Sequence, residues 1–313
     1  MSDPVLSPSL RETIAGFTAG VVSTLTVHPL DVIKTRLQVD RTPASRLGSS
    51  WRIARDIAHN EGSVAAFYRG LTPNLIGNSV SWALYFWWYS NIKDALNAYH
   101  GPERGLSYYD YFIASGAAGA LTAICTNPIW VIKTRMLSTS SKHAGAYTSV
   151  LDGTRHIYRS EGFSGFYRGL VPSLFGVSHG AFQFTAYEQL KNYRASGPVE
   201  AQKDLTNVDY LWLSGLSKIF AGTITYPYQV VRARLQTYDA DKTYRSARDV
   251  VLQVRRQEGW GGFYKGLGPN LLRVVPSTCV TFLVTYTKNI EGSKQQSLGD
   301  HRRWQCLPYG TFG

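Results

Sequence analysis

The sequence of 313 residues has few cysteines and no long apolar runs. Its three cysteines, Cys125, Cys279 and Cys306, are scattered and odd in number, so they indicate neither a disulfide framework nor a CxxC metal site. No segment is an uninterrupted apolar run of about 20 residues, the length that crosses a bilayer. The apolar segments are instead amphipathic and rich in Gly, Ser, Thr and aromatic residues, as in helices that line a water-filled cavity.

The motifs of common enzyme classes are also missing. There is no Gly-rich phosphate loop, no nucleophile elbow and no Cys/His metal set. We therefore expect a protein that is not an enzyme, with no catalytic residues, no cofactor and no metal site. Residues 1–10 are neither Arg-rich nor apolar, so they predict neither a transit peptide nor a secretory signal, and any organelle address is expected to be internal.

A proline motif that recurs three times organises the chain. Pro29, Pro128 and Pro227 are 99 residues apart, and basic residues follow each proline at the fifth and seventh positions. A second motif follows every copy: Glu-Gly, then Phe-Tyr-basic-Gly, then a proline, as in residues 61–73. Three copies of both motifs at one period indicate three copies of one folding unit.

Helical periodicity predicts six long helices and three short ones. The long helices are expected at about 11–38, 73–98, 108–137, 172–194, 209–236 and 269–290. Short amphipathic helices, suited to a membrane interface, are expected at 51–58, 150–159 and 246–257. The predicted organisation is an N-terminal tail (1–10), three repeats (11–99, 108–194 and 209–290) and a C-terminal polar tail (291–313).

Positive charge is concentrated in three connections. The chain has 33 Lys/Arg and 21 Asp/Glu, a formal net charge of +12. Segments 34–71, 133–169 and 232–266 together contain 21 of the basic and 9 of the acidic residues, so they hold the whole excess. A nucleic-acid binder or a scaffold is the usual alternative for such a charge. Confinement to three equivalent connections instead matches the positive-inside rule, so we expect them to share one side of a membrane.

The two repeated motifs resemble those of the mitochondrial carrier family over residues 11–290. The resemblance implies an all-α membrane protein with six transmembrane helices in three pseudosymmetric repeats around a central cavity, and three short matrix-side helices. It implies alternating access in the mitochondrial inner membrane, with both termini toward the intermembrane space. It also implies a monomer that carries a small anionic solute, with lipid, cardiolipin included, as its matrix-side partner and no nucleic acid.

The resemblance also narrows the substrate. Residues 128–130, Pro-Ile-Trp, are similar to those of carriers of NAD, pyrimidine nucleotides and folate or FAD. Residues 226–236, preceded by 217–220, are most similar to the folate/FAD subgroup. We therefore expect transport of FAD or folate, with an NAD or pyrimidine-nucleotide carrier as the alternative. An uncoupling-type proton or anion carrier shares the fold and is less favoured, because Arg273 and Lys218 suit a larger anion.

In this family, the acidic residue of each proline motif pairs with the basic residue of the next repeat and closes the matrix side. An Asp31–Lys133 pair is therefore implied. Trp130 and Gln229 replace the other two acidic residues, so we expect cation stacking and a neutral hydrogen bond there, and a weaker gate. Leu137 departs from the bracing glutamine of the family, and the alternative for the charges is a helix-end role at the lipid interface. The implied matrix-gate residues are Asp31, Lys34, Trp130, Lys133, Gln229, Arg232, Gln38 and Gln236.

The outer gate of the family has an aromatic-acidic-x-x-basic motif. Residues 187–191 match it, residues 89–93 lack the acid, and residues 286–290 lack both charges. At most one ion pair, Lys93 with Glu188, is expected. The implied cytoplasmic-gate residues are Tyr89, Lys93, Tyr187, Glu188, Lys191 and Tyr286.

Substrate contacts in the family lie on the even-numbered helices, one to two turns beyond the aromatic-basic-Gly motif. Counting from that motif gives Gly77, Gly176 with Val177, and Arg273. A flat ring would fit beside the small residue, and Arg273 would hold a phosphate or carboxylate; its alternative is a structural partner. Lys218 is expected to point into the cavity and to bind a diphosphate or a glutamate carboxylate, because a lysine in lipid is costly, with snorkelling as its alternative. The helix-2 stripe of Asn78, Trp82, Tyr85 and Tyr89 would stack on a ring or merely pack, and His28 and His179 are expected to be ordinary polar residues.

Overall fold

A computed structural model describes residues 8–42, 48–62, 64–101, 105–140, 142–143, 145–195 and 207–274. The described part is helical, and no strand occurs in it. Residues 1–7 of the N-terminal tail, the C-terminal tail, Cys279, Cys306, Tyr286 and residues 275–290 of the sixth expected helix lie outside these ranges. The predicted helix 73–98 extends from Leu71 to His100 (α3), and 108–137 corresponds to Tyr108–Ser138 (α4).

The first repeat starts with the long helix α1, Pro8–Val39, which contains Pro29. The short helix α2, Ser49–Asn60, and the 3₁₀ turn η1, Val64–Tyr68, connect α1 to α3. The predicted short helix 51–58 is thus confirmed with slightly wider bounds. Gly62 follows α2 with φ of 68°, the left-handed conformation that a glycine adopts without strain, which is why the Glu-Gly pair stops this helix.

The second and third repeats follow the same order with two breaks that the sequence analysis did not predict. The short helix α5 spans Val150–Phe166, and the expected helix 172–194 is split into α6, Leu170–Phe175, and α7, Val177–Ala195. The expected helix 209–236 is split into α8, Asn207–Ile224, and α9, Tyr226–Leu235. Pro227 lies in the first turn of α9, where its missing N–H costs no helix hydrogen bond, whereas Pro29 and Pro128 stay inside one helix each.

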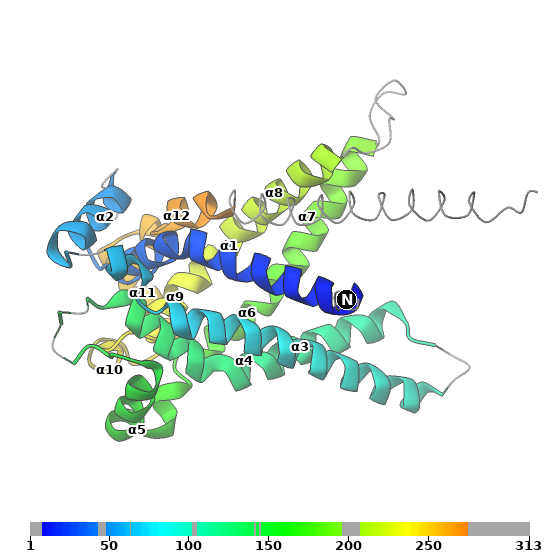
Figure 1. Cartoon of the computed structure of the whole chain (residues 1–313), viewed down its shortest axis with the longest axis horizontal. Helices are drawn as coiled ribbons and strands as arrows, with labels where there is room; N and C mark the ends of the chain where they lie inside the picture. Colours follow the sequence, from blue (N-terminus) through cyan, green and yellow to red (C-terminus); the bar gives the residue numbers. More distant parts are fainter. Residues whose placement is uncertain are drawn as a thin grey trace, which may run out of the picture.

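The third repeat then contains α10, Ala240–Thr243, which was not expected, and α11, Ala247–Gln257, which confirms the predicted short helix. The 3₁₀ turn η3, Trp260–Tyr264, leads to α12, Leu267–Leu272. The short helices α2, α5, α10 and α11 gather at one end of the molecule, and the far ends of α3 and α7 point toward the other (Figure 1). The described parts of the three basic connections thus lie at one end of the molecule, and that they share one side of a membrane stays a prediction.

Each short helix buries an apolar stripe against its own repeat. Ile57 of α2 packs with Val32, Ile157 of α5 packs in a cluster with Val131, and Val250 of α11 packs in a cluster with Val231. All six residues are buried. Large aromatic side chains remain exposed next to these stripes, Trp51 and Trp260 among them. That two-sided character is typical of helices at a membrane interface.

The glycine of the aromatic-basic-Gly motif lets each repeat pack closely against the next. Gly70, Gly169 and Gly266 all have positive φ, between 71° and 83°. They directly precede α3, α6 and α12, with which the second, fourth and sixth helices of the bundle begin. A Cβ on Gly169 would lie 3.2 Å from the Arg232 carbonyl oxygen, and one on Gly266 would lie 2.9 Å from that of Lys34. Glycine is thus required both by the backbone conformation and by the close approach of the neighbouring repeat.

A ring of arginines ties the three repeats together below the proline motifs. Arg36 Nε donates to the Leu137 carbonyl across 3.2 Å, and Arg135 Nε donates to that of Gln236 across 3.2 Å. Arg234 Nε donates to the Gln38 carbonyl across 2.9 Å, so the ring closes from repeat 3 back to repeat 1. The guanidinium groups also pair with the glutamates of the Glu-Gly motifs, Glu61, Glu161 and Glu258.

One helix of the described residues, α4, is long and apolar enough to cross a membrane by length and composition. The polar faces of the other long helices explain why they fall short of that test. Thr24, Asn74, Gln183 and Lys218 line a cavity in the bundle and lower the hydropathy of their helices.

Candidate functional site

The site is a two-part cavity between the helices of the three repeats. The upper part has a volume of about 610 Å³, and the lower part, at the level of the proline motifs, about 310 Å³. Pockets of about 300–1,000 Å³ typically bind small molecules. The two parts are continuous, because they share the lining residues Asp31, Trp130, Lys133, His179, Gln229 and Arg273.

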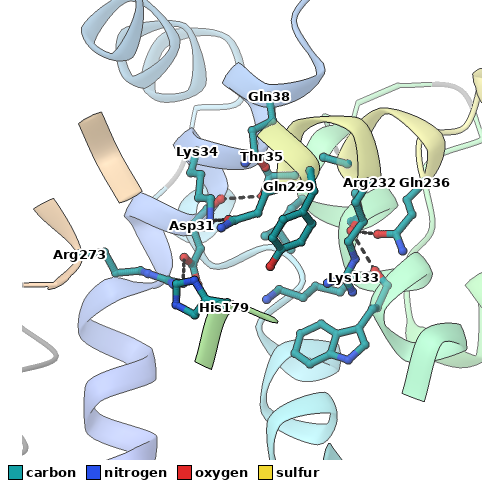
Figure 2. A pocket seen from close by; sticks show the side chains of 15 residues that line it. Asp31, Lys34, Thr35, Gln38, Lys133, His179, Gln229, Arg232, Gln236 and Arg273 are labelled. Carbon is teal, nitrogen blue, oxygen red and sulfur yellow. Dashed lines mark hydrogen bonds and ion pairs between the residues drawn. The ribbon is translucent and has the colours of Figure 1, made fainter. Parts of the chain in front are cut away.

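The ion pair of the site differs from the expected one. Arg273 Nη1 lies 2.8 Å from Asp31 Oδ1, at the junction of α12 and α1. The implied Asp31–Lys133 pair is not formed among the described residues, although Lys133 lines the same pocket. The physical reason is competition for one carboxylate, since a guanidinium is a stronger partner for it than an ammonium. Figure 2 shows Arg273 and Lys133 on different sides of Asp31.

Gln229 accepts a hydrogen bond in place of the missing acidic residue. Lys34 Nζ lies 2.9 Å from Gln229 Oε1 and 2.8 Å from Asn270 Oδ1. Both acceptors are neutral amides, and the ring of Tyr226 lies 5.7 Å from the ammonium. The structure therefore brings Lys34 and Gln229 together as expected, and it adds Asn270 as a partner that the sequence analysis missed.

Trp130 replaces the second missing acidic residue by cation–π contacts. Lys133 Nζ lies 4.7 Å and the Arg232 guanidinium carbon 5.8 Å from the centre of the Trp130 ring. Trp130 Nε1 donates to Thr126 Oγ1 across 3.2 Å, which fixes the ring. The expected stacking of Arg232 on Trp130 is thus present in the geometry, and Lys133 shares the same ring.

The two bracing glutamines hold different partners. Gln38 Nε2 lies 3.2 Å from the Tyr226 hydroxyl, which itself donates to the Lys265 carbonyl. Gln236 Oε1 accepts from Thr134 Oγ1 across 2.9 Å. Leu137, at the third position, packs with Val32, Ile57 and Ala66 instead. The three equivalent positions therefore differ in their contacts: the two glutamines make polar contacts, and the leucine makes an apolar one.

The expected substrate contacts fall into two groups. Arg273, Lys218 and Trp82 line the cavity, together with Asn78. Gly77, Gly176, Val177 and Tyr85 are not among its lining residues. The hydroxyl of Tyr228 lies 3.0 Å from where a Cβ of Gly176 would be, so Tyr228 takes the space expected for a flat ring.

The side chains of α3 form the expected aromatic stripe. The Tyr85 and Tyr89 rings are stacked with their centres 6.1 Å apart. Trp82 stacks on Phe86 at 5.7 Å, and 63% of its surface is exposed. The stripe therefore packs within itself, while Trp82 also presents its ring to the cavity.

The cytoplasmic-gate residues do not form the expected pair between repeats. Lys93 Nζ lies 5.4 Å from the Tyr89 ring centre and 5.7 Å from that of Tyr111. Glu188 Oε1 lies 4.0 Å from Lys191 Nζ of its own helix. Among the described residues, Lys93 and Glu188 thus have other partners. Tyr187 belongs to α7, and Tyr286 lies outside the described residues.

Three polar residues in or beside the cavity have partners that the sequence analysis did not predict. His179, expected to be an ordinary polar residue, lines both parts of the cavity, and its Nδ1 lies 2.8 Å from Thr225 Oγ1. His28 is buried and faces Asn74 and the Arg69 carbonyl. Asn270 follows Pro269 as Asn74 follows Pro73, so comparing the residues after these two prolines could have identified both asparagines.

The charge of the site limits what it can bind. The lower part is lined by four basic side chains and one carboxylate, so it favours anions. No group of three metal-ligating side chains occurs within the described ranges. Chemically, the arrangement is a polar, cationic cavity with aromatic rings at two levels.

Comparison with known proteins agrees with this geometry. The family model described as mitochondrial carrier protein matches residues 6–100, 104–197 and 203–291. The chain is 38% identical to the mitochondrial FAD carrier protein of Saccharomyces cerevisiae, over 91% of this chain and 97% of that protein. It is 40% identical to the chloroplastic nicotinamide adenine dinucleotide transporter 1 of Arabidopsis thaliana, over 87% and 89%.

A third relative is similar to the same degree. The chloroplastic folate transporter 1 of Arabidopsis thaliana is 39% identical over 86% of this chain and 91% of its own length. The family matches cover all three repeats, and its members are transporters rather than enzymes. This chain is therefore a membrane transporter that belongs to the mitochondrial carrier protein family.

Proposed function

We propose that this protein moves FAD across the mitochondrial inner membrane by alternating access, with folate as the second candidate substrate. The observation behind this proposal is the cavity floor, where Lys34, Lys133, Arg232 and Arg273 surround one carboxylate. An anion is needed to balance these groups. The relatives whose names include FAD and folate support the same class of substrate.

The upper cavity supports a substrate with a flat ring system. Trp82 of the first repeat is largely exposed and lines the upper cavity, and Lys218 of the third repeat lines the same cavity. Base and flavin rings stack on aromatic side chains, and a buried lysine is stable when it faces water or an anion. We keep Gly77, Gly176, Val177 and Tyr85 as candidate contacts for a state in which the helices have moved.

NAD is the next candidate, because two plant relatives are named as nicotinamide adenine dinucleotide transporters. It shares the diphosphate and the adenine with FAD. A pyrimidine nucleotide would fit the same charge. An uncoupling-type carrier of protons or small anions is less favoured, because the two cavity parts together suit a ligand larger than a simple ion.

The membrane arrangement is part of the proposal. Six spans would place the basic connections in the matrix, where the positive-inside rule puts them, and both termini toward the intermembrane space. The repeat boundaries 11–99, 108–194 and 209–290 follow from the same symmetry. A monomer with cardiolipin at its matrix side completes the proposed arrangement.

Uptake into proteoliposomes tests this function. Purified protein is reconstituted, and labelled FAD, folate, NAD and UTP are supplied at equal concentrations. We expect saturable FAD uptake that exceeds the others and is absent from protein-free liposomes. Uptake of UTP alone would contradict the FAD proposal and favour a pyrimidine-nucleotide carrier, while no uptake of any of the four would contradict the whole substrate class.

A further inference from the structure

The cavity floor has more basic groups than its own acidic groups can balance. We call Lys34, Lys133, Arg232 and Arg273 the gate cluster; all four line the lower part of the cavity. Among the described residues of this lining, Asp31 is the one carboxylate, and it pairs with Arg273. Three formal positive charges of the gate cluster therefore have no ionic partner in the described part of the chain.

The contacts of the other three cations leave room for an anion. Lys34 donates to two neutral amides, Gln229 and Asn270. Lys133 and Arg232 contact the Trp130 ring, and within the described ranges neither side chain has a hydrogen bond or an ion pair. A ring quadrupole attracts a cation by about 0.5–2 kcal/mol and does not neutralise it.

The arrangement of the gate cluster matches two linked anionic groups better than one. Its members come from α1, α4, α9 and the end of α12, so they reach the cavity floor from all three repeats (Figure 2). Guanidinium groups bind phosphate through paired hydrogen bonds, and ammonium groups act as point charges. A diphosphate offers two adjacent charged groups with several acceptor oxygens to such a set, whereas a carboxylate offers one charge and two oxygens.

We propose that the gate cluster binds the diphosphate of the transported dinucleotide at the floor of the cavity. The proposal rests on the proposed function, because it assigns one part of the substrate to one part of the cavity. The diphosphate would be the ionic partner that Lys133 and Arg232 lack. It would also compete with Asp31 for Arg273. The site would thereby favour a dinucleotide such as FAD or NAD over folate, which has carboxylates in place of the diphosphate.

Inorganic pyrophosphate is the probe that isolates this site. We measure the thermal unfolding temperature of the purified protein in detergent against increasing pyrophosphate, phosphate and sulfate, at constant ionic strength and pH without added metal. We expect half-maximal stabilisation by pyrophosphate at a concentration at least about tenfold lower than by phosphate, since more than one charge-assisted hydrogen bond is added. Equal effects of the three anions would overturn the proposal.

Substitutions assign the response to the gate cluster. Lys133→Gln and Arg232→Gln should each raise the half-maximal pyrophosphate concentration by about tenfold or more, because each removes one charge-assisted contact. Lys133→Arg keeps the charge and should retain most of the response, which excludes a general folding defect. Arg248→Gln, on the exposed face of α11, is the matched control and should behave as the unchanged protein.

The results separate this proposal from the proposed function. FAD uptake with no selective response to pyrophosphate would leave the transport of FAD intact and overturn the diphosphate site. A selective response that survives both Gln substitutions would also overturn it, because the anion would then bind elsewhere. A cluster-dependent response without FAD uptake would support the site and point to another diphosphate compound as substrate.

Discussion

Arg273 holds Asp31 in an ion pair with 2.8 Å between Nη1 and Oδ1, which joins the start of the sixth helix to the proline motif of the first. Asp31 is 6% exposed, so its charge depends on this partner and on the nearby lysines. Because the same arginine is a proposed substrate contact, an incoming anion would compete with Asp31 for it.

The Asp31–Arg273 pair gives the first prediction. Arg273→Gln should lower the thermal unfolding temperature because it leaves the buried carboxylate of Asp31 without this partner, and Asp31→Asn should lower it because it removes the carboxylate from among four basic side chains. The double variant should lose less than the sum of the two, since neither charge remains. Thermal unfolding in detergent measures this coupling, and strictly additive losses would contradict the pairing. Both single variants should also reduce uptake by tenfold or more, on the order of one charge-assisted hydrogen bond.

Trp130 gives the second prediction. Trp130→Asp places a carboxylate between Lys133 and Arg232, where the family motif has an acidic residue. We expect a higher unfolding temperature and slower transport, because ion pairs then hold the matrix side closed more firmly than the cation–π contacts do. Trp130→Phe is the control, since it keeps an aromatic face. Initial uptake rates in proteoliposomes check the outcome, and faster transport by Trp130→Asp would refute the role of this position in the gate.

Glu161 gives a prediction about pH. Burial alone would raise the pKa of this carboxyl, but hydrogen bonds and charges from Arg135 and Arg168 lower it below its usual value. A carboxylate with a lowered pKa stabilises the fold above its unfolded pKa of about 4.3, and this stabilisation is lost as the pH falls through the folded value. Glu161→Gln should therefore lower the unfolding temperature at pH 7 by several degrees.

The difference between Glu161→Gln and the unchanged protein should begin to shrink as the pH falls below the unfolded pKa of about 4.3, and it should be smallest below the lowered folded pKa, where the carboxyl is protonated in both states. Asp94→Asn, at an exposed position of α3, is the control and should cause little change at either pH. Unfolding temperatures recorded from about pH 2 to pH 8 test the prediction, because this range includes the acidic interval in which the carboxyl becomes protonated. A difference that stays constant over this range would indicate lost packing and not a lost charge.

Much of this site could be predicted from the sequence because the repeats are explicit. The period of 99 residues places Asp31, Trp130 and Gln229 at equivalent positions, and their substitution pattern predicts both the Lys34–Gln229 contact and the stacking on Trp130. Helix bounds followed from glycines and prolines. Contacts that depend only on residue type and on the repeat symmetry could therefore be predicted from the sequence.

The choice between partners was not accessible in the same way. Lys133 and Arg273 line the same pocket as Asp31. Which of them forms the ion pair depends on distances in the folded protein, which the spacing of residues along the sequence does not determine. The helix breaks at Gly176 and Thr225 also escaped, because α1 and α4 tolerate their prolines without such a break. Competition between side chains for one partner and local backbone geometry both depend on the tertiary structure. This explains why the ion-pair partner and the helix breaks were predicted wrongly.

Gly169 gives a prediction about repeat packing. Its φ is 71°, and a Cβ there would meet the Arg232 carbonyl oxygen at 3.2 Å. Gly169→Ala should cost about 1–2 kcal/mol for the backbone conformation alone, with a further loss from the contact with the third repeat. Gly180→Ala is the matched control, because no atom lies within 4 Å of its Cβ position and its helical backbone favours alanine. An unchanged unfolding temperature for Gly169→Ala would refute the packing role of this glycine.

Lys218 decides between a substrate contact and a lipid-facing residue. Its side chain lines the upper cavity with Gln183 and Trp82, so an anionic substrate can reach it. Lys218→Gln should raise the KM for uptake about tenfold and leave the unfolding temperature without substrate nearly unchanged, because one charge-assisted contact is lost only in the complex. Lys218→Arg should restore most of the affinity, since the charge is kept. A lower unfolding temperature with an unchanged KM would mean that Lys218 supports packing or reaches the membrane interface, and the upper anion contact would then have to be assigned to Arg273 alone.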